Sequence, residues 1–410
     1  MNKFWNKKSQ EEIKDLVFKA LEENVDYTKQ HALGVPASYL DDKVFNQDAS
    51  FVKDAPWIST LIRNPNHIGC HTLGSSESFF SGTQEIERNL IEICAVDILK
   101  GQPDMQDGYV ASGGTEANMQ AIWVYRNYFM NEFDATREEI CILCSSDSHY
   151  SMNKAGNILA VDLIHVPVSE NQREVEEEEI SKVIVEATNK GKKYFIVVCN
   201  MMTTMFGSVD NIESYTNALQ ANDCHFKLHV DGAYGGFYFP FSNESSSYTF
   251  KNEHISSFTL DAHKMAQAPY GTGVFLIRKG LIHHVNTKEA SYVEGEDLTL
   301  IGSRSGANAI ATWMILVKNG PFGWHEKVFI LQKRTEWMCN QLSDLEIQFY
   351  RNPFSNIITI RGEYISQKVA TLFSLVPDSH SNPKWYKIVV MEHVTIEKLE
   401  YLVQQIKASK

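Results

Sequence analysis

Short apolar runs alternate with amphipathic stretches through the middle of the chain, between about residues 109 and 280. The clearest runs cover residues 140–143, 194–198, 226–230 and 273–277, and another, at 109–112, ends in two glycines and opens a helix. Runs this short, separated by helical segments, are typical of a mostly parallel sheet that helices cover on both faces. The pattern therefore predicts an α/β fold.

Amphipathic segments flank this central region. Residues 9–31 place apolar side chains near helical spacing, and a second helix is expected from about residue 83. Further on, the pattern predicts a helix, then strands at 356–360 and 387–390, and a final helix from Thr395. We therefore expect three parts: a helical N-terminal segment (1–64), a large α/β domain (65–314) and a small C-terminal α+β domain (315–410).

Composition limits the classes of partner. The chain has 410 residues, of which 43% are apolar, and this is enough for a large core. Its formal net charge of -13 disfavours nucleic acid and anionic membranes, because both repel a negative surface. No stretch approaches the ~18 uncharged apolar residues of a membrane helix, and the first residues lack the apolar run of a signal peptide. These features predict a cytoplasmic protein with neither nucleic acid nor membrane as a partner.

The cysteines indicate a reducing compartment and no metal site. There are seven, at irregular spacing, which argues against a disulfide framework. Cys141 and Cys144 form a CxxC pattern, but they stand inside an apolar run that is typical of a buried strand. Residues three apart on a strand point to opposite faces, so we expect both to be core residues rather than ligands of one metal.

Small and hydroxyl side chains stand where the run at 109–112 gives way to a helix, from Ser112 to Thr115. Gly113 and Gly114 let backbone N–H groups approach an anion, and the helix N-terminus adds the positive end of its dipole. Ser112 and Thr115 add hydroxyl donors. The loop is not a nucleotide-binding motif. It is either a phosphate-binding loop or an ordinary helix-capping turn.

Asp231 follows an apolar run and precedes several small residues, which is not a core pattern. Burying a carboxylate is costly unless it has a partner. A protonated pyridine nitrogen is such a partner, and the cationic ring of pyridoxal phosphate then acts as an electron sink. Ala233 would offer that ring a small, flat surface. The alternative is that Asp231 caps the next helix.

Two further side chains follow strand ends. Lys264 comes after another apolar run, and its spacing from Asp231 leaves room for one strand–helix–strand return of the chain. A buried lysine of this kind can form a Schiff base. His149 follows the run at 140–143, where an imidazole can stack on a cofactor ring. Each has a plainer alternative: a surface lysine and a loop-capping histidine.

Taken together, these stretches resemble the group II pyridoxal-phosphate amino acid decarboxylases, and most of all the archaeal-type L-tyrosine/L-aspartate decarboxylases. The resemblance covers about residues 65–315 well and is carried by the segments at 112–118, 229–231, 261–265 and 302–306, with a further likeness at 72–83. It implies the fold of the aspartate aminotransferases, which is fold type I of the pyridoxal-phosphate enzymes.

The resemblance also implies roles for individual residues. Lys264 would form the Schiff base with pyridoxal 5'-phosphate, Asp231 would pair with the ring nitrogen, and His149 would stack on the ring. The family resemblance further places these residues near the cofactor: Ser112, Gly113, Gly114, Thr115, Thr203, Ala233 and His263. The chain departs from the family pattern at Met202, where Gly is usual, and at Gly232, where Ala is commoner.

Tyr292 bears on the type of reaction. It stands in a polar stretch after the lysine, where family decarboxylases have a tyrosine that protonates the substrate carbon after carbon dioxide leaves. The resemblance thus implies α-decarboxylation of an L-amino acid, with aspartate, glutamate, tyrosine and histidine all open. Alternatives are a carbon–carbon lyase similar to sphingosine-phosphate lyase, a transaminase, and a cofactor-binding relic without activity.

Assembly is also implied by the resemblance. The family forms symmetric homodimers with the active site at the subunit interface, and closed two-fold pairing is the commonest oligomer. In that arrangement Ser303 and the segment 72–83 would reach the cofactor of the neighbouring subunit.

Overall fold

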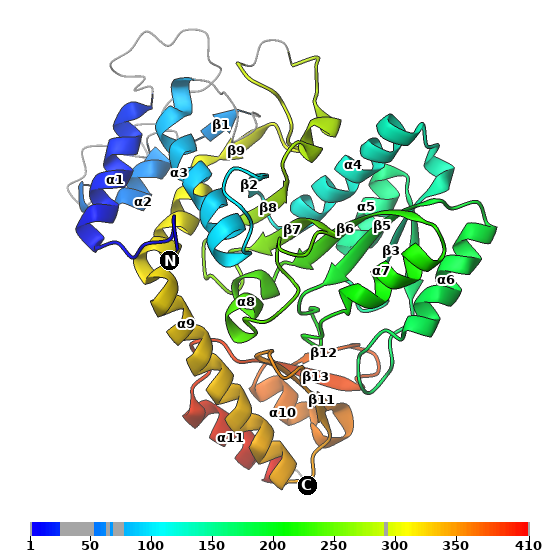
Figure 1. Ribbon diagram of the computed structural model, residues 1–410. Coiled ribbons are helices and arrows are strands. Elements are labelled where there is room, and N and C mark those ends of the chain that lie inside the picture. Colours follow the sequence, from blue (N-terminus) through cyan, green and yellow to red (C-terminus); the bar gives the residue numbers. More distant parts are fainter. Residues whose placement is uncertain (1, 25–52, 63–65, 69–77, 291–293, 409–410) are drawn as a thin grey trace.

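The computed structural model describes residues 2–24, 53–62, 66–68, 78–290 and 294–408 (Figure 1). A seven-stranded sheet lies at its centre, in the order β2-β8-β7-β6-β5-β3-β4. Strands β7, β6, β5, β3 and β4 pair in parallel, and β8 is antiparallel to both of its neighbours. The strands are β2 (Gln106–Ala111), β3 (Ile140–Ser145), β4 (Asp162–Val166), β5 (Tyr194–Asn200), β6 (His225–Gly232), β7 (Ile255–Asp261) and β8 (Gly273–Arg278). The predicted mostly parallel sheet is confirmed.

Helices cover both faces of this sheet. One core contains side chains of α3 (Ser81–Glu92), α6 (Glu177–Asn189) and α7 (Ile212–Ala221), and the other contains those of α4 (Gly114–Phe133) and α5 (Ser151–Leu159). Successive residues of β3 alternate between the two cores, because strand side chains point to opposite faces. Cys141 belongs to the first core and Cys144 to the second. The two cysteines therefore lie on opposite faces, as predicted.

A second sheet, of four strands, lies near the C-terminus in the order β10-β11-β13-β12. It has its own apolar core, and the long helix α9 (Gly306–Asp344) runs from the large sheet to this smaller one (Figure 1). The elements here are β10 (Phe349–Tyr350), β11 (Ile357–Arg361), β12 (Val376–Pro377), β13 (Trp385–Val389), α10 (Gln367–Leu372) and α11 (Ile396–Ala408). The domain boundary expected at residue 314 lies inside α9, and it stays a prediction.

The N-terminal elements pack beside the first part of α9. They are α1 (Gln10–Glu23), α2 (Pro56–Ile62) and β1 (Asn66–Ile68), and β1 pairs with β9 (Ser303–Ser305). Ser9 and Glu12 form a capping box that starts α1, so both side chains hold orphan backbone N–H groups at that end. Residues 25–31 of the helix expected from the sequence lie outside the described residues.

Two features differ from the sequence-based expectation. The edge strand β4 was not expected, because it has one neighbouring strand and most of its side chains are partly or fully exposed, which leaves no apolar run. The helix expected after residue 315 begins earlier, at Gly306, and bends at Gly320, where φ is 64° and Pro321 follows. Proline lacks the N–H that would continue the helical ladder, and this accounts for the bend.

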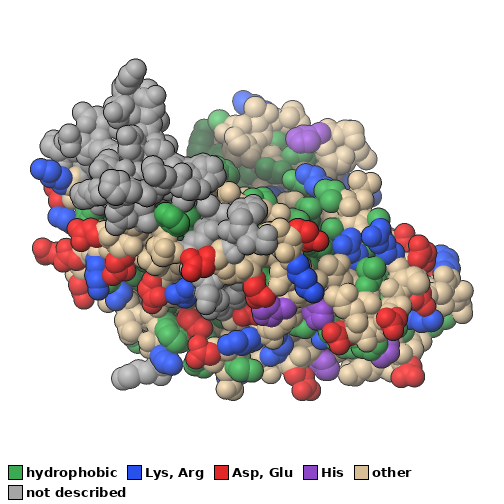
Figure 2. All heavy atoms as spheres, turned by 90° about the horizontal axis from the view of Figure 1, so that it is seen from above, with side chains coloured by type: hydrophobic (Ala, Val, Ile, Leu, Met, Phe, Trp, Pro, Cys, Tyr) green, Lys and Arg blue, Asp and Glu red, His purple; other side chains and the backbone are tan. Residues whose placement is uncertain are grey.

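Surface charge is mixed on the face seen from above. Acidic and basic side chains are interspersed there over the described residues (Figure 2). Among the described helices, none is both long enough and apolar enough to cross a membrane.

Candidate active site

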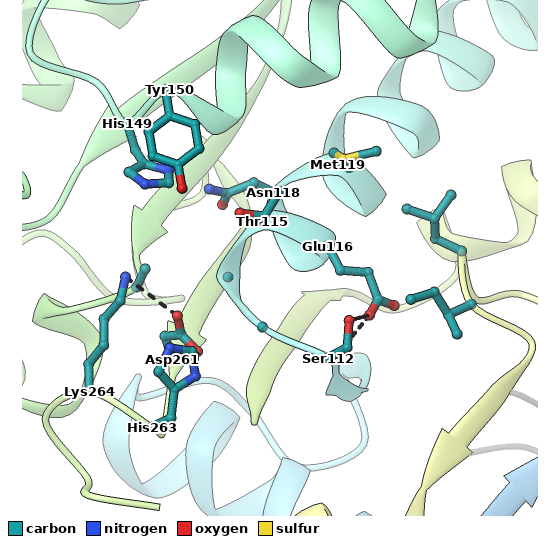
Figure 3. Close-up of a pocket in the computed structure, with 15 residues that line it drawn as sticks. Ser112, Thr115, Glu116, Asn118, Met119, His149, Tyr150, Asp261, His263 and Lys264 are labelled. Atoms are coloured by element: carbon teal, nitrogen blue, oxygen red, sulfur yellow. Dashed lines mark hydrogen bonds and ion pairs between the residues drawn. The ribbon is translucent and has the colours of Figure 1, made fainter. Parts of the chain in front are cut away.

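The predicted site residues meet at the carboxyl ends of neighbouring parallel strands. Asp231 lies at the end of β6 and pairs in register with Thr259 of β7, while Lys264 follows the end of β7. Ligands of open α/β sheets bind at this edge, where the turns after the strands converge. A cavity of about 470 Å³ opens here (Figure 3). The predicted residues that line it are Ser112, Gly113, Gly114, Thr115, His149, Ala233, His263 and Lys264.

A smaller hollow adjoins this cavity and adds two more predicted residues, Asp231 and Thr203. The two hollows share His149, Ala233 and Lys264. The sequence-predicted set is thus brought together from five separate segments of the chain, with the two exceptions given below.

Asp231 is held by hydrogen bonds rather than by a cation. Its carboxylate is 7% exposed and accepts hydrogen bonds from Nδ2 of Asn118 at 2.9 Å and from the backbone N–H of Ala233 at 3.0 Å. None of the ion pairs formed within the described residues involves Asp231. Its negative charge therefore remains available for a cationic group that enters the smaller hollow.

Lys264 has a different carboxylate as its neighbour. Its Nζ lies 3.4 Å from Oδ2 of Asp261, and Nδ1 of His263 lies 2.8 Å from Oδ1 of the same side chain, although without the geometry of a hydrogen bond. Burial raises the pKa of Asp261, while the charges of Lys264 and His263 act in the opposite direction. The lysine points into the cavity in Figure 3, so its amine is both reachable and close to a counter-charge.

The glycine loop brings the N-terminus of α4 to the cavity. Gly113 is the N-cap residue, with φ of 145°, and it has no side chain that could cap the helix, although the carboxylate of Asp261 accepts from the backbone N–H of Gly114. A Cβ atom at Gly114 would lie 3.0 Å from Oδ2 of Asp261 and 3.2 Å from Cβ of Ala233, so only glycine fits without a shift. The N–H groups at the start of this 20-residue helix, one of which already binds a carboxylate, are the donors that an anion site uses.

Ser112 has a neighbour that the sequence did not suggest. Its backbone N–H and its Oγ both donate to Oε2 of Glu116, at 2.6 and 2.7 Å (Figure 3). Glu116 is buried and also accepts from the hydroxyl of Tyr109 at 3.1 Å. The donors of Ser112 are therefore engaged within the loop, and a phosphate contact from Ser112 stays a prediction.

His149 lies on the other side of the cavity from the glycine loop (Figure 3). Its Nδ1 is 2.9 Å from Oγ of Ser151 and accepts from the backbone N–H of Ser151 at 3.2 Å. Burial lowers the pKa of His149, an effect that Asp231 opposes. These contacts fix the plane of the imidazole, and its ring centroid lies 4.0 Å from that of Tyr150.

Thr203 and Met202 belong to a tight turn after β5. Oγ1 of Thr203 lies 2.7 Å from Oγ of Ser208. Met202 has φ of 71°, which is a left-handed conformation that glycine adopts at least cost. That conformation gives a physical reason why glycine is usual in the related decarboxylases, and the turn keeps it here with a buried methionine.

The structure places one predicted residue outside the site and does not describe another. Ser303 is exposed on β9 and lines neither hollow. Tyr292 lies outside the described residues, as does 72–77 of the segment 72–83.

The structure also adds residues that the sequence did not indicate. Asn118 binds Asp231 directly, and Met119, Tyr150, Leu300 and Ile301 form an apolar rim at the cavity. Lys387 comes from β13 of the small sheet, where its Nζ donates to the carbonyl of Thr204 at 2.9 Å. Burial lowers the pKa of Lys387, and the charge of Lys264 lowers it further.

The donor set fits pyridoxal phosphate. The site has a reachable amine, a buried carboxylate that forms no ion pair with a described residue, a helix N-terminus beside glycines, and an imidazole next to a small alanine. Together with the mostly parallel seven-stranded sheet, these features define a pyridoxal-phosphate enzyme of fold type I.

Comparison with known proteins identifies the family. Residues 85–328 match the model of the pyridoxal-dependent decarboxylase conserved domain, and the chain belongs to this family. It is 49% identical over 407 residues to the tryptophan decarboxylase of Clostridium sporogenes, a match that covers 99% of this chain and 97% of that one. It is 30% identical to a probable L-tyrosine/L-aspartate decarboxylase of Methanothermobacter thermautotrophicus, over 80% and 88% of the two chains.

A solved structure agrees on the fold. L-methionine decarboxylase from Streptomyces sp. 590 superposes with a TM-score of 0.72 at 18% identity, covering 97% of this chain and 94% of that chain. The resemblance drawn from the sequence is confirmed. The protein is a pyridoxal-phosphate-dependent amino acid decarboxylase, and therefore a lyase.

Proposed function

We propose that the chain decarboxylates an aromatic L-amino acid, with tryptophan as the preferred substrate. The observation that carries this proposal is the apolar rim of the larger cavity, formed by Met119, Tyr150, Leu300 and Ile301. The cavity of about 470 Å³ lies within the size range of small-molecule sites. The 49% identity to a tryptophan decarboxylase supports the same choice.

The charges of the cavity argue against acidic substrates. Among its described lining residues Lys264 is the one lysine or arginine, and its amine already lies beside Asp261. A second carboxylate on the substrate would lose water without gaining a dedicated partner, which is costly. An indole or phenol ring instead buries a large apolar area against the rim. Of the four substrates that the sequence left open, tyrosine fits this rim best, and the rim adds tryptophan to the set.

We assign the following roles within the site. Lys264 would bind the cofactor covalently, and Asp231 would hold a proton on its ring nitrogen. His149 and Ala233 would contact the ring, and the N-terminus of α4 at Gly113 would receive the phosphate. When bound, pyridoxal phosphate supplies a cationic ring that accepts the electron pair of the breaking bond between the α-carbon and the carboxylate.

Lys387 is the cation that we assign to the substrate α-carboxylate. Support comes from its half-buried side chain and from its contact with Thr204, which lines the smaller hollow, and the charge of Lys264 lowers the pKa of Lys387. An ammonium held by the carbonyl of Thr204 has further N–H donors to offer. Tyr292 keeps its sequence-based role as the proton donor, and it stays a prediction.

We further propose a cytoplasmic homodimer in which Ser303 and the segment 72–83 contact the neighbouring site. Exposure of Ser303 outside both hollows is consistent with a role across an interface. The six described cysteines are free thiols, as in a reducing compartment. Sedimentation at assay concentration tests the assembly: active monomers would contradict it.

The decisive experiment is carbon dioxide release from each of the twenty amino acids with added pyridoxal phosphate. We expect tryptophan to give the highest kcat/KM, followed by tyrosine and phenylalanine. A preference for aspartate or glutamate would overturn the substrate assignment but leave the reaction type. The substrate preference thus tests the cavity rim, and carbon dioxide release from any amino acid tests the catalytic residues.

A further inference from the structure

We propose that Asn118, backed by His229, is a positioning residue that orients Asp231 and His149 at the same time. This inference rests on the proposed role of those two side chains at the cofactor. It concerns a buried hydrogen-bond network beneath the site, on the face of the sheet that α4 covers.

The geometry of the strands creates this network. His229 and Asp231 are two residues apart on β6, so their side chains point to the same face. Ser257 and Thr259 of the adjacent strand β7 are their register partners. Four polar side chains therefore stand side by side under α4, and Asn118 reaches them from the first turns of that helix.

Asn118 contacts three of the groups involved. Its Nδ2 donates to Oδ2 of Asp231 at 2.9 Å and to Oγ of Ser151 at 3.0 Å. Its Oδ1 lies 3.0 Å from Nε2 of His229. Ser151 in turn lies 2.9 Å from Nδ1 of His149. One amide thus connects the carboxylate at the ring nitrogen with the imidazole at the ring face.

The donor that Asn118 presents to Asp231 fixes the direction of the other bonds in the network. A carboxylate only accepts, so Asn118 must turn its amino group towards Asp231 and its carbonyl towards His229. Nε2 of His229 then carries the hydrogen. Its Nδ1, 2.7 Å from Oγ of Ser257, accepts from that hydroxyl. Tyr125 donates to Ser257 and ends the chain of bonds.

The side chains that support Asp231 are buried and neutral. Asn118 is 1% exposed, and His229, Ser257 and Ser151 are fully buried. Burial lowers the pKa of His229 to about 4, so the ring is neutral at neutral pH. A neutral donor orients Asp231 without cancelling its charge. A lysine or arginine in the same place would compete with the cationic ring for that carboxylate.

The test measures binding of pyridoxal phosphate to the apo-protein, which needs no turnover. We expect Asn118→Leu to raise the dissociation constant about tenfold or more, because a hydrogen bond to a charged group is lost. Asn118→Asp should weaken binding further, since two carboxylates would then face each other. Asn127→Leu, at a partly buried position further along the same helix and away from both hollows, is the matched control and should bind as wild type does.

Two variants of His229 separate positioning from simple packing. Glutamine can still donate an N–H to Oδ1 of Asn118, whereas leucine cannot. We expect His229→Gln to stay within about threefold of the wild-type dissociation constant and His229→Leu to match Asn118→Leu. Visible circular dichroism of the bound cofactor should fall, per molecule bound, in both leucine variants, because the ring loses its fixed orientation.

The outcomes are distinguishable. Wild-type protein that does not bind pyridoxal phosphate would refute the proposed function itself. If wild type binds pyridoxal phosphate and Asn118→Leu has the same affinity and dichroism, the network alone would be refuted. Should Asn118→Leu fail to fold, the His229 pair decides, because both variants keep Asn118: equal affinities and equal dichroism for glutamine and leucine would overturn the proposal.

Discussion

The inner wall of the cavity, formed by Asp231, His149 and Lys264, differs in construction from the outer apolar rim. On the inner wall, Asp231 and His149 are held by hydrogen bonds to buried side chains of the sheet and its helices. On the rim, Tyr150 and Ile301 are 59% and 40% exposed and come from loops. The wall therefore has one defined arrangement, while the rim offers a surface that loop changes can alter.

This difference separates reaction type from substrate choice. The wall residues bear on chemistry that all amino acid substrates would share. The rim contacts what differs between substrates, namely the side chain. Enzymes with a common fold and cofactor can thus act on different amino acids through changes in loops, without disturbing the buried wall.

Removing the wall amine should have the largest effect. Lys264→Ala should reduce turnover by several orders of magnitude, because no other side chain of the wall supplies the nucleophilic amine. In wild-type protein, borohydride should fix the cofactor on Lys264, as peptide mass spectrometry would report. A label on another lysine would show that the wall has been assigned wrongly.

Removing the charge of Asp231 should have the second-largest effect on the rate. Asp231→Asn keeps the size of the side chain and its contact with Ala233, but its amide nitrogen cannot accept from Asn118, so a modest fall in the melting temperature is expected. The rate should fall by several orders of magnitude, because an unprotonated ring is a poorer electron sink. A variant that stays within about tenfold of the wild-type rate would place Asp231 away from the ring nitrogen.

Much of this wall could be predicted from the sequence, and the rim could not. Asp231, Lys264 and His149 are polar side chains that directly follow apolar strands, so position and chemistry point the same way. Asn118 lies inside a helix and Lys387 lies on a strand of the distant small sheet. Neither is a polar side chain at the end of an apolar run, so the sequence pattern did not point to them. Rim residues such as Leu300 are ordinary apolar side chains, and only the folded chain brings them to the cavity.

The same reasoning applies to the fold. Buried strands can be recognised in the sequence as apolar runs, whereas the edge strand β4 is partly exposed and has no such run. The early start of α9 at Gly306 follows Ser305, a residue type that often precedes helices, but its side chain makes no cap hydrogen bond and two small residues follow it.

The next prediction concerns Tyr292, which separates decarboxylation from the related reactions. Tyr292→Phe keeps the ring but removes the acid, so release of carbon dioxide should continue while amine formation slows by about a hundredfold. More aldehyde or pyridoxamine phosphate should accumulate. The measurement compares these three products for wild type and variant on the best substrate. Unchanged yields would exclude Tyr292 from proton transfer.

A change at the rim should have a smaller, substrate-dependent effect. Ile301→Ala should lower kcat/KM for tryptophan by about tenfold or more, because apolar contacts with the substrate are lost. The loss should be smaller for an amino acid with a short side chain. Ile158→Ala is the matched control, since Ile158 is 62% exposed and lines neither hollow. Equal losses of kcat/KM for all substrates would mean that Ile301 affects the catalytic residues of the wall rather than the substrate side chain.

The smallest effect is expected behind the wall, at Asp210. This buried carboxylate accepts hydrogen bonds from the backbone and side chain of Asn200, both at 2.7 Å. Asn200 also donates to Ser145 and Ser148, which lie in and just after β3, ahead of His149. Burial raises the pKa of Asp210 to about 6. The wall is therefore supported by a carboxylate that titrates below neutral pH.

The sign of the pH dependence follows from that shift. Because the pKa of Asp210 is higher in the folded protein than in the unfolded chain, its contribution to stability is present below about pH 4 and is lost as the pH rises through about 6. Asp210→Asn removes this loss and should raise the free energy of unfolding at pH 7.5 by about 1–3 kcal/mol. Thermal unfolding at pH 7.5 and pH 4 measures it, with the exposed Asp344→Asn as control. A variant that is less stable than wild type at pH 7.5 would show that the ionised carboxylate, rather than its protonated form, supports the wall.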